Sequence, residues 1–169
     1  MVLSTVNWLE DSVRISSTSI EVIDSLRGHF DGLPIHEILG RRSLALKQHF
    51  DTFSLPRLKV ARNAAVHPDL QNSKLPANYR VDMFIDDPRS KASIAIELCL
   101  NNREAIGTNL LKLDLALSQN RDSNDELIAV VIAPSKELLE RGGWDRAYAD
   151  ASEYLHFLQI GLKKHMSVN

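Results

Sequence analysis

This 169-residue chain has a single cysteine, so no disulfide can form within it. A lone cysteine fits a reducing compartment, and we therefore expect a cytoplasmic protein. The first eleven residues lack the basic start and the long apolar run of a secretory signal peptide. No apolar stretch approaches the ~18 residues of a membrane-spanning helix, so we expect no membrane partner.

Low-complexity segments and obvious internal repeats are also absent from the sequence. The length predicts a single domain over residues 1–169. A chain of this length can bury roughly two-thirds of its unfolded surface and needs no covalent staple. With 44% hydrophobic and 25% charged residues, its composition is that of an ordinary globular protein.

The chain has little net charge, −2 at pH 7, which argues against nucleic acid because DNA-binding proteins often carry clustered basic charge. The charge distribution is less neutral. Residues 41–62 contain six basic side chains and one acidic one, a local net charge of +5. The basic residues are Arg41, Arg42, Lys47, Arg57, Lys59 and Arg62. This segment predicts either a solvated helix face or a stripe that contacts DNA phosphates.

Two strand patterns, at residues 79–85 and 93–100, are joined by a turn-forming segment at 86–91 that contains Asp, Pro and Ser. If the turn is centred between residues 89 and 90, Asp82 and Glu97 lie opposite each other on the two strands. Cross-strand partners share one face, with their Cβ atoms roughly 4.5–5.5 Å apart. Two carboxylates at that distance repel unless a proton or a cation lies between them. The pair therefore predicts a divalent-metal site on a β-hairpin.

The second strand alternates between two faces. Its apolar set, which can enter a core, is Ile94, Ile96, Leu98 and Leu100. Glu97 takes the other face with Ala95 and Cys99, in a strand otherwise fit for burial, where an unpaired carboxylate is costly. The alternative is an edge hairpin whose acidic side chains are solvated.

The rest of the pattern predicts helices alternating with a few strands. Ser/Thr residues at 16–19 can cap a helix at 20–28, and a second helix is expected at 36–50. A short helix or strand is expected within 58–65, a helix at 103–118 and a buried strand at 127–133. The predicted fold class is α/β, a central mixed β-sheet flanked by helices.

Three segments after Asp82 carry a family resemblance. They read Glu97-Leu98-Cys99-Leu100-Asn101-Asn102, then Leu110-Leu111-Lys112-Leu113, then Ala133-Pro134-Ser135-Lys136-Glu137-Leu138. Over residues 80–139, roughly a third of the chain, this pattern resembles the PD-(D/E)XK nuclease core. It is more closely similar to the BglII/BstYI group of restriction endonucleases, relatives of BamHI. In that group a Glu-x-Gln strand precedes a Gly/Asn-rich turn, a helix with a Leu-Lys-aliphatic step and a strand ending in apolar-Pro-x-Lys-Glu-Leu.

The resemblance implies a restriction endonuclease-like core and Mg²⁺-dependent hydrolysis of phosphodiester bonds in double-stranded DNA, with Mn²⁺ as a substitute for Mg²⁺. It implies Asp82 and Glu97 as catalytic metal ligands, joined by the backbone carbonyl of Leu98. Cutting both strands of a twofold-symmetric site implies a homodimer. The expected protein is thus a type II restriction-like enzyme.

The chain departs from the family pattern at Cys99, which stands where the usual catalytic Lys would be. The BglII group also lacks that Lys and uses Gln. A thiolate is a soft ligand, whereas Mg²⁺ prefers hard oxygens, and a neutral thiol organises water poorly. Cys99 is therefore either a catalytic residue or a small core filler. The chain is then an active nuclease, a nuclease-fold protein that binds DNA without cutting it, or a metal enzyme acting on another substrate.

Five further residues are candidate accessory groups. Lys112 can be a migrated substitute for the missing Lys, or a helical Lys that snorkels to the surface or pairs with an acid. His67 and Asn63 compete as the polar active-site residue that the BglII group carries ahead of its Asp. Asn101 and Asn102 either form the turn after Glu97 or contact a phosphate or a base edge.

Overall fold

This computed structural model describes residues 16–33, 43–66, 80–100, 105–118, 126–134 and 140. They run in the order α1 (Ser17–Asp31), α3 (Ser43–Thr52), β1 (Lys59–Ala65), β2 (Arg80–Asp87), β3 (Ala92–Leu98), α4 (Ile106–Ser118) and β4 (Glu126–Ile132). The predicted α/β class is confirmed. No helix among these residues is long and apolar enough to cross a membrane.

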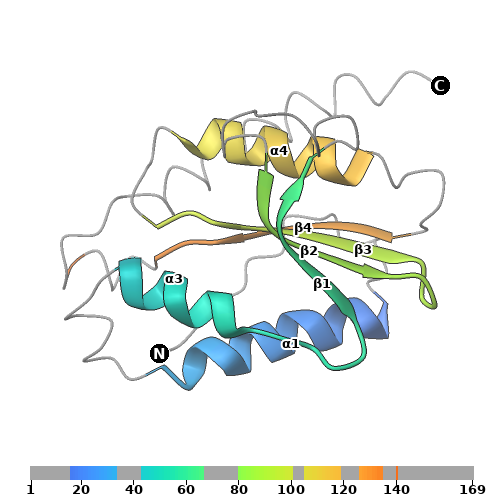
Figure 1. The fold of residues 1–169 in the computed structure, drawn as a ribbon, viewed down its shortest axis with the longest axis horizontal. Helices are drawn as coiled ribbons and strands as arrows, with labels where there is room; N and C mark the ends of the chain where they lie inside the picture. The colour runs from blue at the N-terminus through green and yellow to red at the C-terminus, as the bar shows by residue number, and fades with distance from the viewer. Residues whose placement is uncertain are drawn as a thin grey trace.

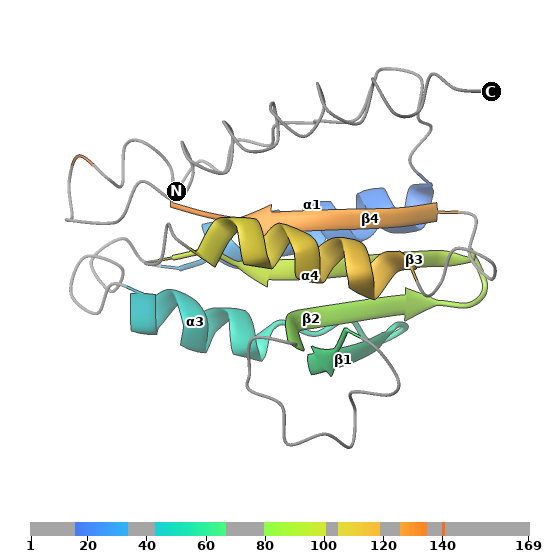
Figure 2. The same cartoon turned by 90° about the horizontal axis from the view of Figure 1, so that it is seen from above.

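The strands form one mixed sheet in the order β1-β2-β3-β4. The first three strands are antiparallel neighbours, and β4 runs parallel to β3. A parallel pair requires a crossover connection, and α4 lies on that connection between β3 and β4. As Figures 1 and 2 show, α4 covers one face of the sheet, and α1 and α3 cover the other.

Both faces of β3 are buried. On the side of α1 and α3, Ile94 and Ile96 pack in a core cluster with Phe30 and Phe50. On the side of α4, Ala95 packs with other buried residues of a second cluster, which include Val81, Leu113 and Ala116. The predicted alternation is therefore confirmed. The alternative of a solvated edge hairpin is wrong for Glu97, because β3 lies between β2 and β4 and that side chain is buried.

Helix α1 is longer than its sequence pattern predicted. The Ser16 side chain caps it by accepting a hydrogen bond from the Ser19 backbone N–H at 3.2 Å, as expected of Ser in this segment. The prediction that Gly28 ends the helix is wrong, since α1 continues to Asp31. Phe30 is buried in the core, and packing of this last turn outweighs the low helix propensity of one glycine.

Other element boundaries differ by a few residues. The segment left open as helix or strand is β1, and the second helix continues past its predicted end at residue 50 to Thr52. Strand β2 extends through Asp87, which the turn pattern had assigned to the turn. Asp87 still organises that turn, accepting hydrogen bonds from Ser90 Oγ at 2.6 Å and Arg89 N at 3.1 Å. The hydrogen bond from Ser90 is the main reason why the pKa of Asp87 lies below its usual value.

Candidate active site

Asp82 and Glu97 meet where the β2–β3 hairpin ladder stops. The register runs from Asp87↔Ala92 to Met83↔Ile96, which centres the turn between residues 89 and 90, as predicted. One more step places Asp82 opposite Glu97. At this position a side chain of β2 replaces the backbone as the acceptor. The Asp82 Oδ2 accepts a hydrogen bond from the Leu98 N–H at 2.9 Å. Glu97 lies on the α4 side of the sheet, the side of Ala95, where it contacts Lys112 of that helix.

Glu97 is held in the interior by a lysine from α4. The Lys112 Nζ lies 2.9 Å from Glu97 Oε1, with side-chain exposures of 11% for Lys112 and 2% for Glu97. The ammonium approaches this oxygen outside hydrogen-bonding angles, and Oε1 accepts no hydrogen bond from the described residues. Lys112 Nζ also donates to the backbone carbonyl of Arg80 at 3.1 Å. Of the alternatives for Lys112, pairing with an acid is confirmed and snorkelling is wrong.

The electrostatic state of Glu97 follows from this environment. Burial raises its pKa to about 7, and the negative charge of Asp82 acts in the same direction. Contact with Lys112 opposes the rise. A carboxyl group in this position accommodates a proton or a cation more readily than an exposed glutamate does.

Cys99 lies on the same side of β3 as Glu97 but in apolar surroundings. It is 3% exposed, packs with Ile106 from α4, and its Sγ accepts a hydrogen bond from Asn109 Nδ2 at 3.0 Å. Burial raises the pKa of the thiol to about 11, so the sulfur is neutral at pH 7. Packing alone accounts for a cysteine here, and its catalytic role stays a prediction.

The carboxylate pair fits a magnesium ion better than a softer metal. Mg²⁺ is commonly held by one or two carboxylates and completes its shell with water and substrate phosphates. Asp82 and Glu97 supply two such hard donors, and Glu97 Oε1 is a buried oxygen without a hydrogen bond from the described residues. In the placed part of the chain, no group of three or more His, Cys, Asp or Glu side chains could hold a metal.

Comparisons with protein-family models, with curated proteins and with solved structures found no match to this chain.

The sequence analysis did not identify Asn109 and Arg80, which also belong to this cluster. Asn109 and Lys112 are three positions apart on α4 and share a face, so the helical spacing could have paired them. Arg80 lies two positions before Asp82 on β2, which puts both on one strand face. Its carbonyl anchors Lys112, and its Nη1 donates to the Asn63 carbonyl at 3.0 Å.

Asn63 is an accessory candidate that the structure places opposite Asp82. The β1–β2 register pairs Arg62 with Met83 and Ala64 with Val81, so Asn63 falls opposite Asp82. Its φ of 47° is in the left-handed region, where Asn is enriched among non-glycine residues. The Asn63 side chain is exposed. His67, Asn101, Asn102 and residues 135–139 of the quoted Pro-x-Lys-Glu-Leu segment lie outside the described residues.

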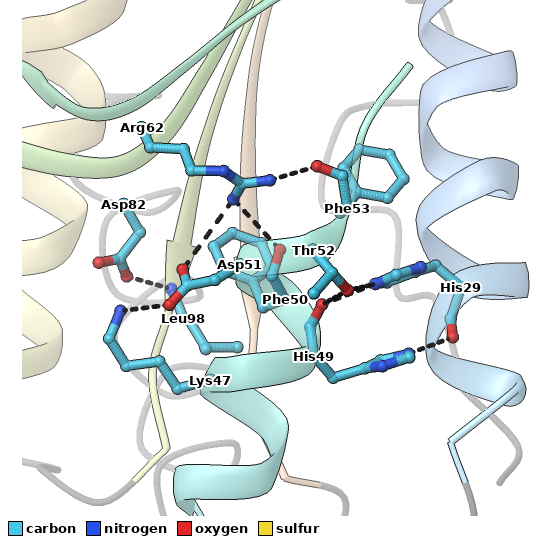
Figure 3. A network of polar contacts seen from close by, with 10 residues as sticks. All are labelled: His29, Lys47, His49, Phe50, Asp51, Thr52, Phe53, Arg62, Asp82 and Leu98. Carbon is cyan, nitrogen blue, oxygen red and sulfur yellow. Dashed lines mark hydrogen bonds and ion pairs between the residues drawn. The ribbon is translucent and has the colours of Figure 1, made fainter. Parts of the chain in front are cut away.

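Two described residues of the basic segment, Arg62 and Lys47, have their partners at α3 rather than at the carboxylates. Figure 3 shows Arg62 turned toward the end of α3, where Nη1 donates to Phe50 O at 3.2 Å and Nη2 donates to Phe53 O. Lys47 pairs with Asp51 at 3.7 Å on the exposed face of α3. These contacts explain both residues without a phosphate.

Arg57 and Lys59 remain exposed, and no ion-pair partner is described for either of them within the placed residues. Lys59 faces Asp86 across the β1–β2 ladder, four positions along β2 from Asp82. Arg41 and Arg42 lie outside the described residues. Contact of any of these side chains with DNA stays a prediction.

The C-terminal end of α3 contacts α1 through two histidines, one from each helix. His29 and His49 each place Nε2 near the other's backbone carbonyl, at 2.8 Å and 2.6 Å, and their rings stack with centroids 4.0 Å apart. Because a carbonyl only accepts, each Nε2 carries a hydrogen and donates it. This pair packs the two helices together on the face of the sheet opposite the carboxylates.

Proposed function

We propose that this protein is a Mg²⁺-dependent endonuclease that hydrolyses phosphodiester bonds of double-stranded DNA in the manner of restriction enzymes. The observation that carries this proposal is the convergence of Asp82, Glu97 and Lys112 at the open end of the β2–β3 hairpin. Two carboxylates and a lysine are a combination that suits metal-assisted hydrolysis of a phosphate ester. Lys112 reaches the position from α4 rather than from β3, as expected of a migrated substitute for the missing Lys.

The chain order of the elements supports a restriction endonuclease-like core. The family pattern asks for a strand with Asp, a strand with Glu, a helix with a Leu-Lys-aliphatic step and a further strand. The hairpin strands β2 and β3 carry Asp82 and Glu97, α4 carries Lys112, and β4 follows. The topology and the site thus agree with the resemblance in the same segment of sequence.

In this proposal Asp82, Glu97 and the carbonyl of Leu98 would hold Mg²⁺. When bound, Mg²⁺ would neutralise charge on the scissile phosphate and make water a better nucleophile at neutral pH. Asp82 keeps the ends of β2 and β3 in register by binding the Leu98 N–H, and this fixes the spacing of the donor oxygens. Lys112 contributes a positive charge that can stabilise the charge developing on the phosphate. Because phosphoryl chemistry depends mainly on position and charge, these roles need no further nucleophile from the protein.

A homodimer belongs to the same proposal. A duplex site with twofold symmetry presents two scissile bonds in equivalent settings, and two copies of one chain match that symmetry. We expect sedimentation with a palindromic duplex to give two chains per DNA. One chain per duplex under cleaving conditions would contradict the dimer.

The second candidate function is a nuclease-fold protein that binds DNA or another partner without cutting it. The observation in its favour is Cys99, whose neutral, buried thiol neither donates a hard ligand nor orients water. The ion pair with Lys112 also compensates the charge of Glu97 in the absence of a metal.

Supercoiled and linear DNA incubated with Mg²⁺ or Mn²⁺ separate the two candidates. The nuclease yields discrete fragments, whereas the binder yields a mobility shift and intact DNA. Asp82→Asn and Glu97→Gln should each abolish cleavage and leave DNA binding intact or tighter, because a negative charge near phosphate is removed. Asp86→Asn is the matched control, since Asp86 is on the same strand and accepts from Ser93 Oγ at 3.0 Å, away from the site. Full cleavage by both active-site variants would exclude the proposed metal site.

A further inference from the structure

The Lys112 ammonium already occupies the place of a cation beside Glu97. Nζ lies 2.9 Å from Oε1 and 3.1 Å from the Arg80 carbonyl, so it is held from β3 and from β2. The Lys112 side chain is 11% exposed and that of Glu97 is 2% exposed. A charge-bearing pair with so little access to water has few other ways to compensate its charges.

A divalent ion bound to Glu97 Oε1 would meet this ammonium at close range. Both cations would share one oxygen, and charges of the same sign a few ångströms apart repel strongly where water is largely excluded. Asp82 offers a second carboxylate on the neighbouring strand, but its Oδ2 is already bonded to the Leu98 N–H. The site as described thus already has one cation 2.9 Å from Glu97 Oε1.

We infer that Lys112 is a resident counter-ion that a divalent cation must displace from Glu97, so that the ion pair and the metal exclude each other. This inference rests on the proposed metal-dependent function and adds a control on it. The metal-free protein tolerates its buried carboxylate because Lys112 compensates the charge. Metal binding frees the ammonium while the site is loaded, and only then is Lys112 available to a phosphate. Divalent affinity is consequently weakened by the protein's own side chain.

The test is the affinity for Mn²⁺ of the full chain, measured by calorimetry at pH 8.5, where protons compete poorly. Lys112→Met removes the ammonium and keeps an apolar stem of similar length. We expect its dissociation constant to fall about tenfold, within the usual range for coupling between two ligands of one site. Lys47→Met is the matched control, because it deletes an ion-paired lysine from the exposed face of α3, and its affinity should equal that of the wild type.

A double-mutant cycle assigns the effect to Glu97. In the Glu97→Gln background, Lys112→Met should leave the Mn²⁺ dissociation constant unchanged. If the gain in affinity persisted there, or if Lys112→Met bound Mn²⁺ no tighter than the wild type, the competition would be disproved while the metal site stood. If the wild type and Lys112→Met both failed to bind Mn²⁺, the proposed metal-dependent function would fall, and the competition with it.

A second measurement covers the case in which Lys112→Met does not fold. The variant Lys112→Arg keeps the positive charge but lacks this lysine. In spectra of ¹⁵N-lysine-labelled protein, the ammonium resonance that is present in the wild type and absent from Lys112→Arg is therefore that of Lys112. Addition of Mg²⁺ to the wild type should shift or broaden that resonance as the ion pair opens. A resonance that stays unchanged at metal saturation would show that Lys112 and the metal coexist, and would overturn the inference.

Discussion

Asp82 on β2 reaches across the hairpin to the backbone of Leu98 on β3, with 2.9 Å between Oδ2 and N. The residue opposite Asp82 in the register is Glu97, so this bond is made one position beyond the end of the regular ladder. A carboxylate proposed to hold metal is thus also a structural element of the hairpin. Its two roles can be separated by substitution.

The structural role predicts different stabilities for two Asp82 variants. Asp82→Asn keeps an oxygen acceptor for the Leu98 N–H, so its free energy of unfolding should lie within about 1 kcal/mol of the wild-type value. Asp82→Ala removes the acceptor and should lower the free energy of unfolding by about 1–3 kcal/mol, because a partly buried donor is left unpaired. Urea denaturation measures both. Equal stabilities for Asn and Ala would mean that the hydrogen bond to Leu98 contributes nothing.

Glu97 predicts a pH dependence of stability. Its folded-state pKa of about 7 lies above the ordinary value of 4.5, so the folded protein holds this proton more tightly than the unfolded chain. Protonation of Glu97 therefore contributes to the free energy of unfolding in full below pH 4.5, and this contribution is lost as the pH rises to about 7. The full change is on the order of 3 kcal/mol.

The measurement for Glu97 is the difference in unfolding free energy between the wild type and Glu97→Gln at several pH values. This difference should shift against the wild type as the pH rises from 4.5 to 7. The exposed Glu21 on α1 supplies a matched control, Glu21→Gln, which makes the same chemical change away from the site. If the wild type instead became more stable relative to Glu97→Gln as the pH rises, Lys112 would outweigh burial in setting the pKa of Glu97.

Cys99 should behave as an unreactive thiol in the folded protein. Only thiolates react readily with disulfide reagents, and burial raises the pKa of this thiol to about 11. We expect an aromatic disulfide reagent to modify Cys99 at pH 8 only as fast as the protein unfolds, and at once in denaturant. Rapid modification of the native protein would instead indicate an accessible thiolate and favour a role in the site.

The exposed basic residues predict the salt dependence of DNA binding. Phosphate contacts release counterions, so log affinity should fall with log salt by about 0.9 per phosphate contacted. Replacement of Arg57 and Lys59 together by Ala should make this slope shallower by about 1–2 units, for random and cognate DNA alike. Arg27→Gln is the control, since Arg27 pairs with Asp24 at 3.2 Å on α1. An unchanged slope in the double variant would place the DNA-binding surface elsewhere.

Local patterns in the sequence were enough to predict the hairpin and its register. Strand alternation and the Asp-Pro-Arg-Ser turn are properties of neighbouring residues, and together they set Asp82 opposite Glu97. The same holds for the Ser16 cap and for the apolar faces of β3. These features depend on contacts within a few residues or across one tight turn, so little tertiary information is needed to predict them.

Helix and strand ends could not be predicted in this way. Gly28 lowers the local helix propensity, but the burial of Phe30 in the core extends α1 by three further residues. Propensity differences amount to about 1 kcal/mol, whereas burial of an aromatic ring contributes about 1.5–3 kcal/mol. The longer-range term therefore determines where α1 ends.

Only the tertiary structure decided how the charges at the site are compensated. The sequence singled out Lys112 without identifying which acid it pairs with, and it presented Arg62 as part of a basic stripe. The crossover from β3 through α4 to β4 lays Lys112 against Glu97, while β1 turns Arg62 toward the carbonyls at the end of α3. The partner of a long cationic side chain is set by the packing of elements that are distant in sequence. The sequence alone therefore determined which carboxylates face each other, and the fold determined which cation lies beside them.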